Sequence, residues 1–111
     1  MKVVIIGAGE QGYVLTWKLA SNPAVDEIVV ADSDEKRAQD VATRVGAGKA
    51  VAALVDALDV EQVAAIAIGA ELIINAVIPE CDEALMRAAL KAGTHYQDMA
   101  TPPCQDDVRR S

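Results

Sequence analysis

Residues 2–12 read KVVIIGAGEQG, an apolar β-branched run that ends at a glycine and continues through two more. The first five residues of this run are typical of a fully buried strand. Gly7, Gly9 and Gly12 match the pattern G-x-G-x-x-G, and the segment 10–20 has its apolar residues at helical spacing. The glycines therefore stand between a predicted strand and a predicted helix, the context in which such a loop binds phosphate groups.

Each glycine of this motif has its own expected role. Gly7 permits the tight turn, Gly9 leaves the backbone open to a pyrophosphate, and Gly12 lets the helix pack closely on the strand. We expect Glu10 to point outward, because its carboxylate would otherwise repel the phosphates. A glycine-rich turn without a ligand is the alternative interpretation. The predicted phosphate-binding residues are Gly7, Ala8, Gly9, Glu10, Gln11 and Gly12.

The alternation of strand and helix continues along the chain. Strands are predicted at 2–6, 27–31, 50–55, 71–77 and 94–98, and helices at 10–20, 34–45, 59–69 and 79–92. This order requires parallel strands joined by right-handed crossovers. We therefore expect an α/β fold of the Rossmann type, a doubly wound parallel sheet in the order 3-2-1-4-5 with helices on both faces. Its crevice would lie at the carboxyl ends of strands one and four.

Asp32 follows the second predicted strand and lies 20 residues after Gly12. This is where dinucleotide-binding domains place an acidic acceptor for the adenosine ribose, and we assign Ser33 to the same subsite. A carboxylate here favours NAD over NADP, because it repels a 2′-phosphate. NADP stays open as the alternative, since Ser33, Lys36 and Arg37 could surround that phosphate.

Two further strand ends complete the predicted site. Asp56 and Ala57 follow the third strand and are expected to border the adenine. Asn75, Ala76 and Val77 end the fourth strand and are expected to line the nicotinamide side. A turn or helix-cap role is the alternative for Asp56.

Composition excludes several functional classes. A net charge of −7 opposes binding to nucleic acid, and no apolar run is long enough to span a membrane. With no cleavage-site pattern at the amino terminus, we expect a cytoplasmic protein. Cys81, Cys104 and the single histidine, His95, lack the spacing of a metal site, so we expect no metal.

The segments VVIIGAGEQG, IVVADSD, LIINAVIPE and AGTHYQDMA resemble the amino-terminal portion of the saccharopine dehydrogenase family, over residues 1 to about 102. The run Asn-Ala-Val-x-Pro, from Asn75, and the run Ala-Gly-x-His-Tyr-x-Asp, ending at Asp98, are the parts more particular to that family. Ile78 departs from the paired prolines common there. The resemblance gives the three glycines the phosphate role and Asp32 the ribose role, and implies that Asp98 faces the active-site crevice.

By this resemblance the parent enzyme is an oxidoreductase that uses NAD(P) to transfer hydride at a carbon–nitrogen centre, forming or cleaving a secondary amine through an imine. Family members carry most substrate-binding and proton-transferring groups in a second domain. We therefore expect a dinucleotide-binding domain at 1–100 and a linker or tail at 101–111. The catalytic residues and the small-molecule substrate would belong to a missing domain, and the chain alone would be inactive.

Two other functional classes stay open. An NAD-sensing regulatory domain, like those that gate potassium transport, uses the same glycine pattern and the same acidic strand end. A reductase or epimerase of Rossmann type acting on another substrate is the second alternative. Whether the chain forms a homodimer is also left open.

Overall fold

The structure, a computed structural model, describes residues 1–77 and 81–98. Within these residues five strands alternate with four helices, as the sequence pattern predicts. In chain order they are β1 (Lys2–Ile6), α1 (Glu10–Ala20), β2 (Glu27–Asp32), α2 (Glu35–Val45), β3 (Ala50–Leu54), α3 (Val60–Ile66), β4 (Leu72–Asn75), α4 (Asp82–Ala92) and β5 (His95–Asp98).

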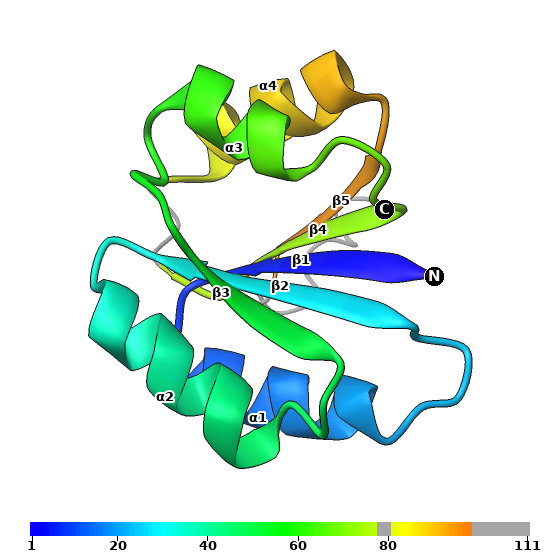
Figure 1. Cartoon of the computed structure of the whole chain (residues 1–111). Coiled ribbons are helices and arrows are strands. Elements are labelled where there is room, and N and C mark those ends of the chain that lie inside the picture. The colour runs from blue at the N-terminus through cyan, green and yellow to red at the C-terminus, as the bar shows by residue number, and fades with distance from the viewer. Residues whose placement is uncertain (78–80, 99–111) are drawn as a thin grey trace, which may run out of the picture.

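The strands form one parallel sheet in the order β3-β2-β1-β4-β5, which confirms the predicted fold (Figure 1). Helices α1 and α2 cover one face of the sheet, and α3 and α4 cover the other (Figure 1). The order in which strands are added to the sheet reverses at β1, whose neighbours are β2 and β4. Ile6, the last residue of β1, lies opposite Ala31 and Asn75, so the carboxyl ends of three strands meet at this point.

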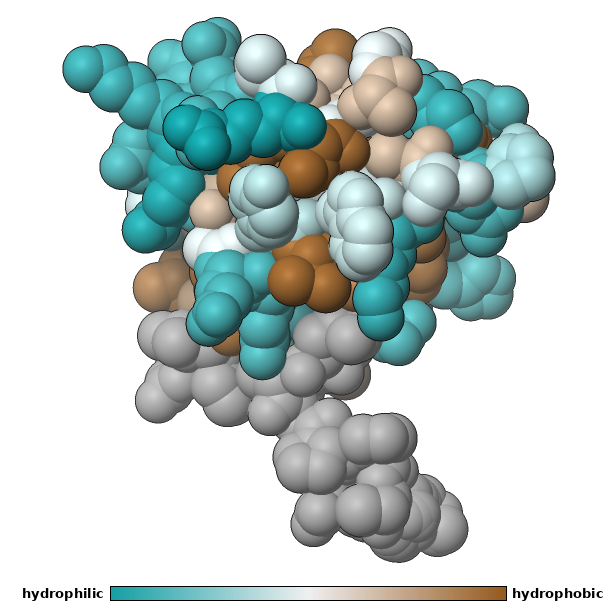
Figure 2. Space-filling view, turned by 90° about the horizontal axis from the view of Figure 1, so that it is seen from below, coloured by the Kyte–Doolittle hydropathy of each residue, from teal (hydrophilic) through white to brown (hydrophobic). Residues whose placement is uncertain are grey.

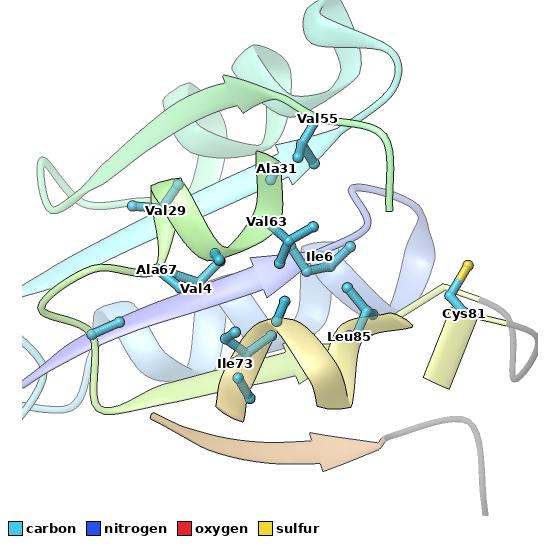
Figure 3. Packing of buried hydrophobic residues seen from close by; sticks show 14 residues of the cluster. Val4, Ile6, Val29, Ala31, Val55, Val63, Ala67, Ile73, Cys81 and Leu85 are labelled. Atoms are coloured by element: carbon cyan, nitrogen blue, oxygen red, sulfur yellow. The ribbon is translucent and has the colours of Figure 1, made fainter. Parts of the chain in front are cut away.

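The central strand β1 is buried on both faces because its side chains alternate between two apolar layers. Val3 and Ile5 pack in the layer beneath α1 and α2. Val4 and Ile6 pack in the layer beneath α3 and α4 (Figure 3). All four side chains are at most 1% exposed, and burying each contributes about 1.5–3 kcal/mol. This burial fixes the point at which the glycine loop leaves the sheet.

Several element boundaries differ from the sequence pattern; helix α3, for example, ends at Ile66 rather than at residue 69. Strand β4 ends at Asn75 rather than at residue 77, because the Asn75 Oδ1 atom accepts the N–H of Val77 and turns the chain. The predicted helix start at Pro79 lies outside the described residues. Among the residues that are described, α4 begins at Asp82. The helix ends at Ala92 and is capped by Gly93, which adopts the left-handed conformation with a φ of 72°.

Figure 2 shows the face that α1 and α2 present, on which hydrophilic residues predominate and hydrophobic ones lie between them. On α1, Trp17 is 58% exposed and lies on this surface. Across the part of the chain that the structure describes, no helix is long and apolar enough to cross a membrane.

Candidate functional site

The glycine loop leaves β1 and enters α1 within three residues. Gly7 has a φ of 116°, which side-chain-bearing residues rarely adopt, and its N–H donates to the Ala31 oxygen at 2.7 Å. Gly9 is the N-cap of α1 and provides no side chain to cap it. The first N–H groups of a helix have no partner within the helix, and together with the helix dipole they favour an anion.

The three glycines meet different surroundings. A Cβ atom on Gly12 would lie 1.9 Å from the Gly7 oxygen, so only glycine allows α1 to pack here. A Cβ atom on Gly7 would lie 2.9 Å from Val77 Cγ1. A Cβ atom on Gly9 would meet nothing within 4 Å. Gly7 and Gly12 are therefore required by the fold itself, whereas the space in front of Gly9 is open.

Asp32 ends β2 and points beneath the glycine loop. One carboxylate oxygen accepts the N–H of Ala8 at 2.7 Å, and the other accepts the N–H of Asp34 at 2.8 Å. Burial raises the pKa of the Asp32 carboxyl, but the two N–H donors and the Arg37 guanidinium outweigh burial, so the pKa lies below its ordinary value. Asp32 is therefore a carboxylate at neutral pH, held against the backbone of the loop.

Arg37, from the first turn of α2, lies over Asp32. Its Nη2 atom is 3.4 Å from each carboxylate oxygen, and its side chain is 56% exposed while that of Asp32 is 4% exposed. These contacts are long for a charge-assisted pair, which normally measures about 2.7–2.9 Å. The guanidinium is therefore only loosely paired with Asp32, and more than half of its side chain stays exposed to solvent.

A pocket of about 300 Å³ opens at the carboxyl ends of the strands. Six predicted site residues line it, namely Gly7, Asp32, Ser33, Asp56, Ala57 and Val77. Arg37, named above only for the NADP alternative, also lines it, together with four residues that were not predicted, namely Ile6, Val55, Leu58 and Cys81. The pocket therefore joins the ends of β1, β2 and β3 to the segments that follow β3 and β4.

A second hollow, of about 490 Å³, lies on the side of the glycine loop that faces α2. Three predicted residues line it, Ala8, Gly9 and Glu10, together with Tyr13, Val14, Arg37, Asp40 and Val41. Glu10 is exposed and borders both this hollow and the outer surface of α1. Arg37 lines both hollows, which places its guanidinium between the ribose position and the phosphate loop. Gln11 lies apart from both, on the exposed surface of α1.

The remaining predicted residues have other surroundings. Asp56 Oδ1 accepts the N–H of Leu58 at 2.9 Å, a turn contact of the kind considered as its alternative role. Asn75 is fully buried and does not line the pocket, because its side chain bonds to Asp82, Tyr96 and the N–H of Val77. Ala76 donates its N–H to the Ile6 oxygen at 2.8 Å.

Some of the pocket residues that were not predicted have a signal in the sequence, and others have none. Val55 directly precedes the predicted Asp56, so the end of the third strand could have suggested it. Cys81 has no such signal, because its place depends on the path of the chain after β4. Asp98 pairs with Asn75 in the sheet, and the described part of the structure does not include the Asp98 side chain. Within residues 1–77 and 81–98, no three metal-ligating side chains form a cluster.

Comparison with known proteins agrees with this geometry. The family model described as "Saccharopine dehydrogenase NADP binding domain" matches residues 3–110. Carboxyaminopropylagmatine dehydrogenase from Synechocystis is 35% identical over 106 residues. That alignment covers 92% of this chain and 27% of the Synechocystis enzyme, so the chain spans about a quarter of that relative.

Solved structures show the same fold. Saccharopine dehydrogenase (L-Glu forming) from Saccharomyces cerevisiae has a TM-score of 0.76 at 18% identity, covering 96% of this chain and 23% of the yeast chain. Quinate dehydrogenase from Corynebacterium glutamicum, in complex with NAD, has a TM-score of 0.61 at 21% identity, covering 86% and 43% of the two chains. The expected resemblance is confirmed, and the chain belongs to the family of saccharopine dehydrogenase NADP-binding domains.

Proposed function

We propose that this chain is the dinucleotide-binding part of an oxidoreductase that transfers hydride at a carbon–nitrogen centre. The observation that carries the dinucleotide-binding part of the proposal is the open space before Gly9, next to a helix start that no side chain caps and a buried carboxylate at the end of β2. The carbon–nitrogen part is supported by the family to which the chain belongs. In dinucleotide-binding domains these positions receive the pyrophosphate and the adenosine ribose.

The proposed pose follows the two hollows. The pyrophosphate lies over Gly9 at the start of α1, and the ribose lies beside Asp32 and Ser33. The adenine enters the pocket near Asp56 and Ala57. The nicotinamide lies on the β4 side, where Val77 provides the wall and Asn75 and Ala76 shape the backbone behind it.

The choice between NAD and NADP depends on Asp32 and Arg37 in this pose. Asp32 alone favours NAD, as the sequence pattern indicates. Arg37 reduces that preference, because its guanidinium pairs with Asp32 and retains donors on the side where a 2′-phosphate would lie. We propose that both dinucleotides bind and that Arg37 supports the phosphorylated one, in agreement with the family description.

Hydride transfer needs a substrate held against the nicotinamide in a site that excludes water. We propose that residues 1–100 form the cofactor domain, that 101–111 lead toward a second domain, and that this second domain supplies the substrate-binding and proton-transferring groups. The support is the relative named for a dehydrogenase activity, of which this chain spans 27%. A cytoplasmic location remains a prediction, and whether the chain forms a homodimer stays open.

The proposal is tested on the whole enzyme that carries this chain. Consumption of NADPH or NADH is measured with α-keto acids plus amino acids, and with aldehydes plus agmatine or diamines. Turnover with an amine and a carbonyl compound together, and with neither alone, is the expected result. Turnover with carbonyl compounds alone would contradict the carbon–nitrogen assignment and would indicate an enzyme that reduces carbonyl groups to alcohols.

A further inference from the structure

Three polar side chains from different elements meet beside the carboxyl end of β4. Asn75 Nδ2 donates to Asp82 Oδ1 at 2.7 Å and to the Tyr96 hydroxyl at 3.2 Å, and that hydroxyl donates to the same oxygen of Asp82. Asn75 is fully buried, and the other two residues are half-buried. A partly buried network of this kind holds each member in one orientation, because an unpaired member would be costly.

The cluster is connected to the pocket through the backbone N–H of Val77. Asn75 Oδ1 accepts the N–H of Val77 at 2.9 Å, and Val77 lines the pocket. Val77 also lies against the glycine loop, since a Cβ atom on Gly7 would come within 2.9 Å of Val77 Cγ1 and 2.8 Å of the Ala76 oxygen. The orientation of Asn75 therefore sets where the segment after β4 meets the first glycine.

We propose that Asn75, Asp82 and Tyr96 are positioning residues that hold Val77 as the wall against the nicotinamide half of the dinucleotide. The proposal rests on the proposed function, which places the nicotinamide on the β4 side of the crevice. The cluster residues do not line the pocket themselves, so they act on the ligand through Val77.

The positions of these residues in the fold support this role. Asn75 ends β4, Asp82 begins α4 and Tyr96 lies in β5, so the three side chains come from three elements on the nicotinamide side of the crevice. The fold brings Asn75 and Tyr96 together through Asp82. A hydrogen-bonded link between β4, α4 and β5 would keep the wall in place while the phosphate loop binds its part of the dinucleotide independently.

The test separates the two halves of the ligand. Binding of NADH and NADPH to the 111-residue chain is compared with binding of ADP-ribose and 2′-phospho-ADP-ribose, which lack the nicotinamide. The variants are Tyr96→Phe, which removes only the hydroxyl, and Asp82→Ala. Glu83→Ala is the matched control, because it removes an exposed carboxylate from the same helical turn.

We expect Tyr96→Phe and Asp82→Ala to weaken NADH or NADPH binding about tenfold while ADP-ribose binding stays within about twofold. Glu83→Ala should change neither, and Asp82→Asn, which keeps an acceptor oxygen, should restore most of the loss. Thermal melting checks that each variant is folded. If Asp82→Ala does not fold, Tyr96→Phe alone tests the proposal.

Equal weakening of dinucleotide and ADP-ribose binding, or no weakening at all, would overturn the positioning role. The same holds if the wild-type chain binds the dinucleotide no more tightly than ADP-ribose, although dinucleotide binding itself would then stand. A wild-type chain that binds none of the four ligands would instead refute the proposed function, and this inference with it.

Discussion

The Asp32 carboxylate accepts the backbone N–H of Ala8 at 2.7 Å, which ties the end of β2 to the middle of the glycine loop. The second carboxylate oxygen accepts the N–H of Asp34 at 2.8 Å and so fixes the turn into α2. One buried side chain thus sets the positions of both the loop and the helix that carries Arg37. Its charge state matters for the stability of the site as well as for ligand recognition.

Asp32→Asn should destabilise the chain by about 1–3 kcal/mol at pH 7, because an amide has one acceptor oxygen and its NH2 group would face one of the two N–H donors. The pKa of Asp32 is lowered in the folded chain, so its contribution is complete above the unfolded value of about 3.9 and is lost as the pH falls through the folded value. The difference between wild type and variant should therefore shrink below about pH 4.

Urea unfolding of both proteins between pH 7 and strongly acidic pH measures this difference. Glu27→Gln, which replaces an exposed carboxylate of β2, is the control and should unfold like the wild type at each pH. A difference between wild type and Asp32→Asn that stays constant over the whole range would refute the role assigned to the Asp32 charge.

Helix α4 offers a matched pair of leucines for testing the core. Leu85 is completely buried against the sheet (Figure 3), and Leu90 is 82% exposed. Leu85→Ala should lower the free energy of unfolding by about 2–5 kcal/mol through lost burial and a new cavity. Leu90→Ala should change it by less than about 0.5 kcal/mol. Similar losses in the two variants, measured by urea unfolding, would show that α4 packs differently.

Arg37 provides a test of dinucleotide preference. Arg37→Ala removes donors for a 2′-phosphate and leaves the Asp32 charge without its counter-ion, so NADPH binding should weaken about tenfold more than NADH binding. Lys36→Ala is the control, since Lys36 is an exposed neighbour that lines neither hollow. Isothermal titration with both dinucleotides gives the ratio. An unchanged ratio in Arg37→Ala would exclude Arg37 from the 2′-phosphate subsite.

Much of the fold was predictable because its determinants are local. The run at 3–6 is apolar throughout, as a strand segment buried on both faces must be, and Gly7 marks its end. The spacing from Gly12 to Asp32 gave the acidic strand end, since it spans one complete helix and the next strand. Such features depend on chain order and periodicity alone.

The parts of the site that were not predictable depend on side-chain direction. Lys36 and Arg37 are adjacent on α2, and only the phase of the helix decides which of them faces Asp32. Asn75 was expected at the pocket surface, but its partners Asp82 and Tyr96 lie 7 and 21 residues away in sequence. Nothing in the local sequence pattern indicates that the Asn75 amide bonds to Asp82 and Tyr96 rather than to a ligand.

The central claim is that a diphosphate approaches the backbone at Gly9. Gly9→Ala meets no atom within 4 Å and should cost the fold no more than about 1 kcal/mol, whereas Gly12→Ala would clash with the Gly7 oxygen and should not fold normally. Isothermal titration of folded wild-type and Gly9→Ala chains with NADPH and NADH is the most direct measurement. The account predicts binding by the wild type and a loss of at least about tenfold in the variant. Equal affinity in the two proteins, with matched melting temperatures, would contradict it.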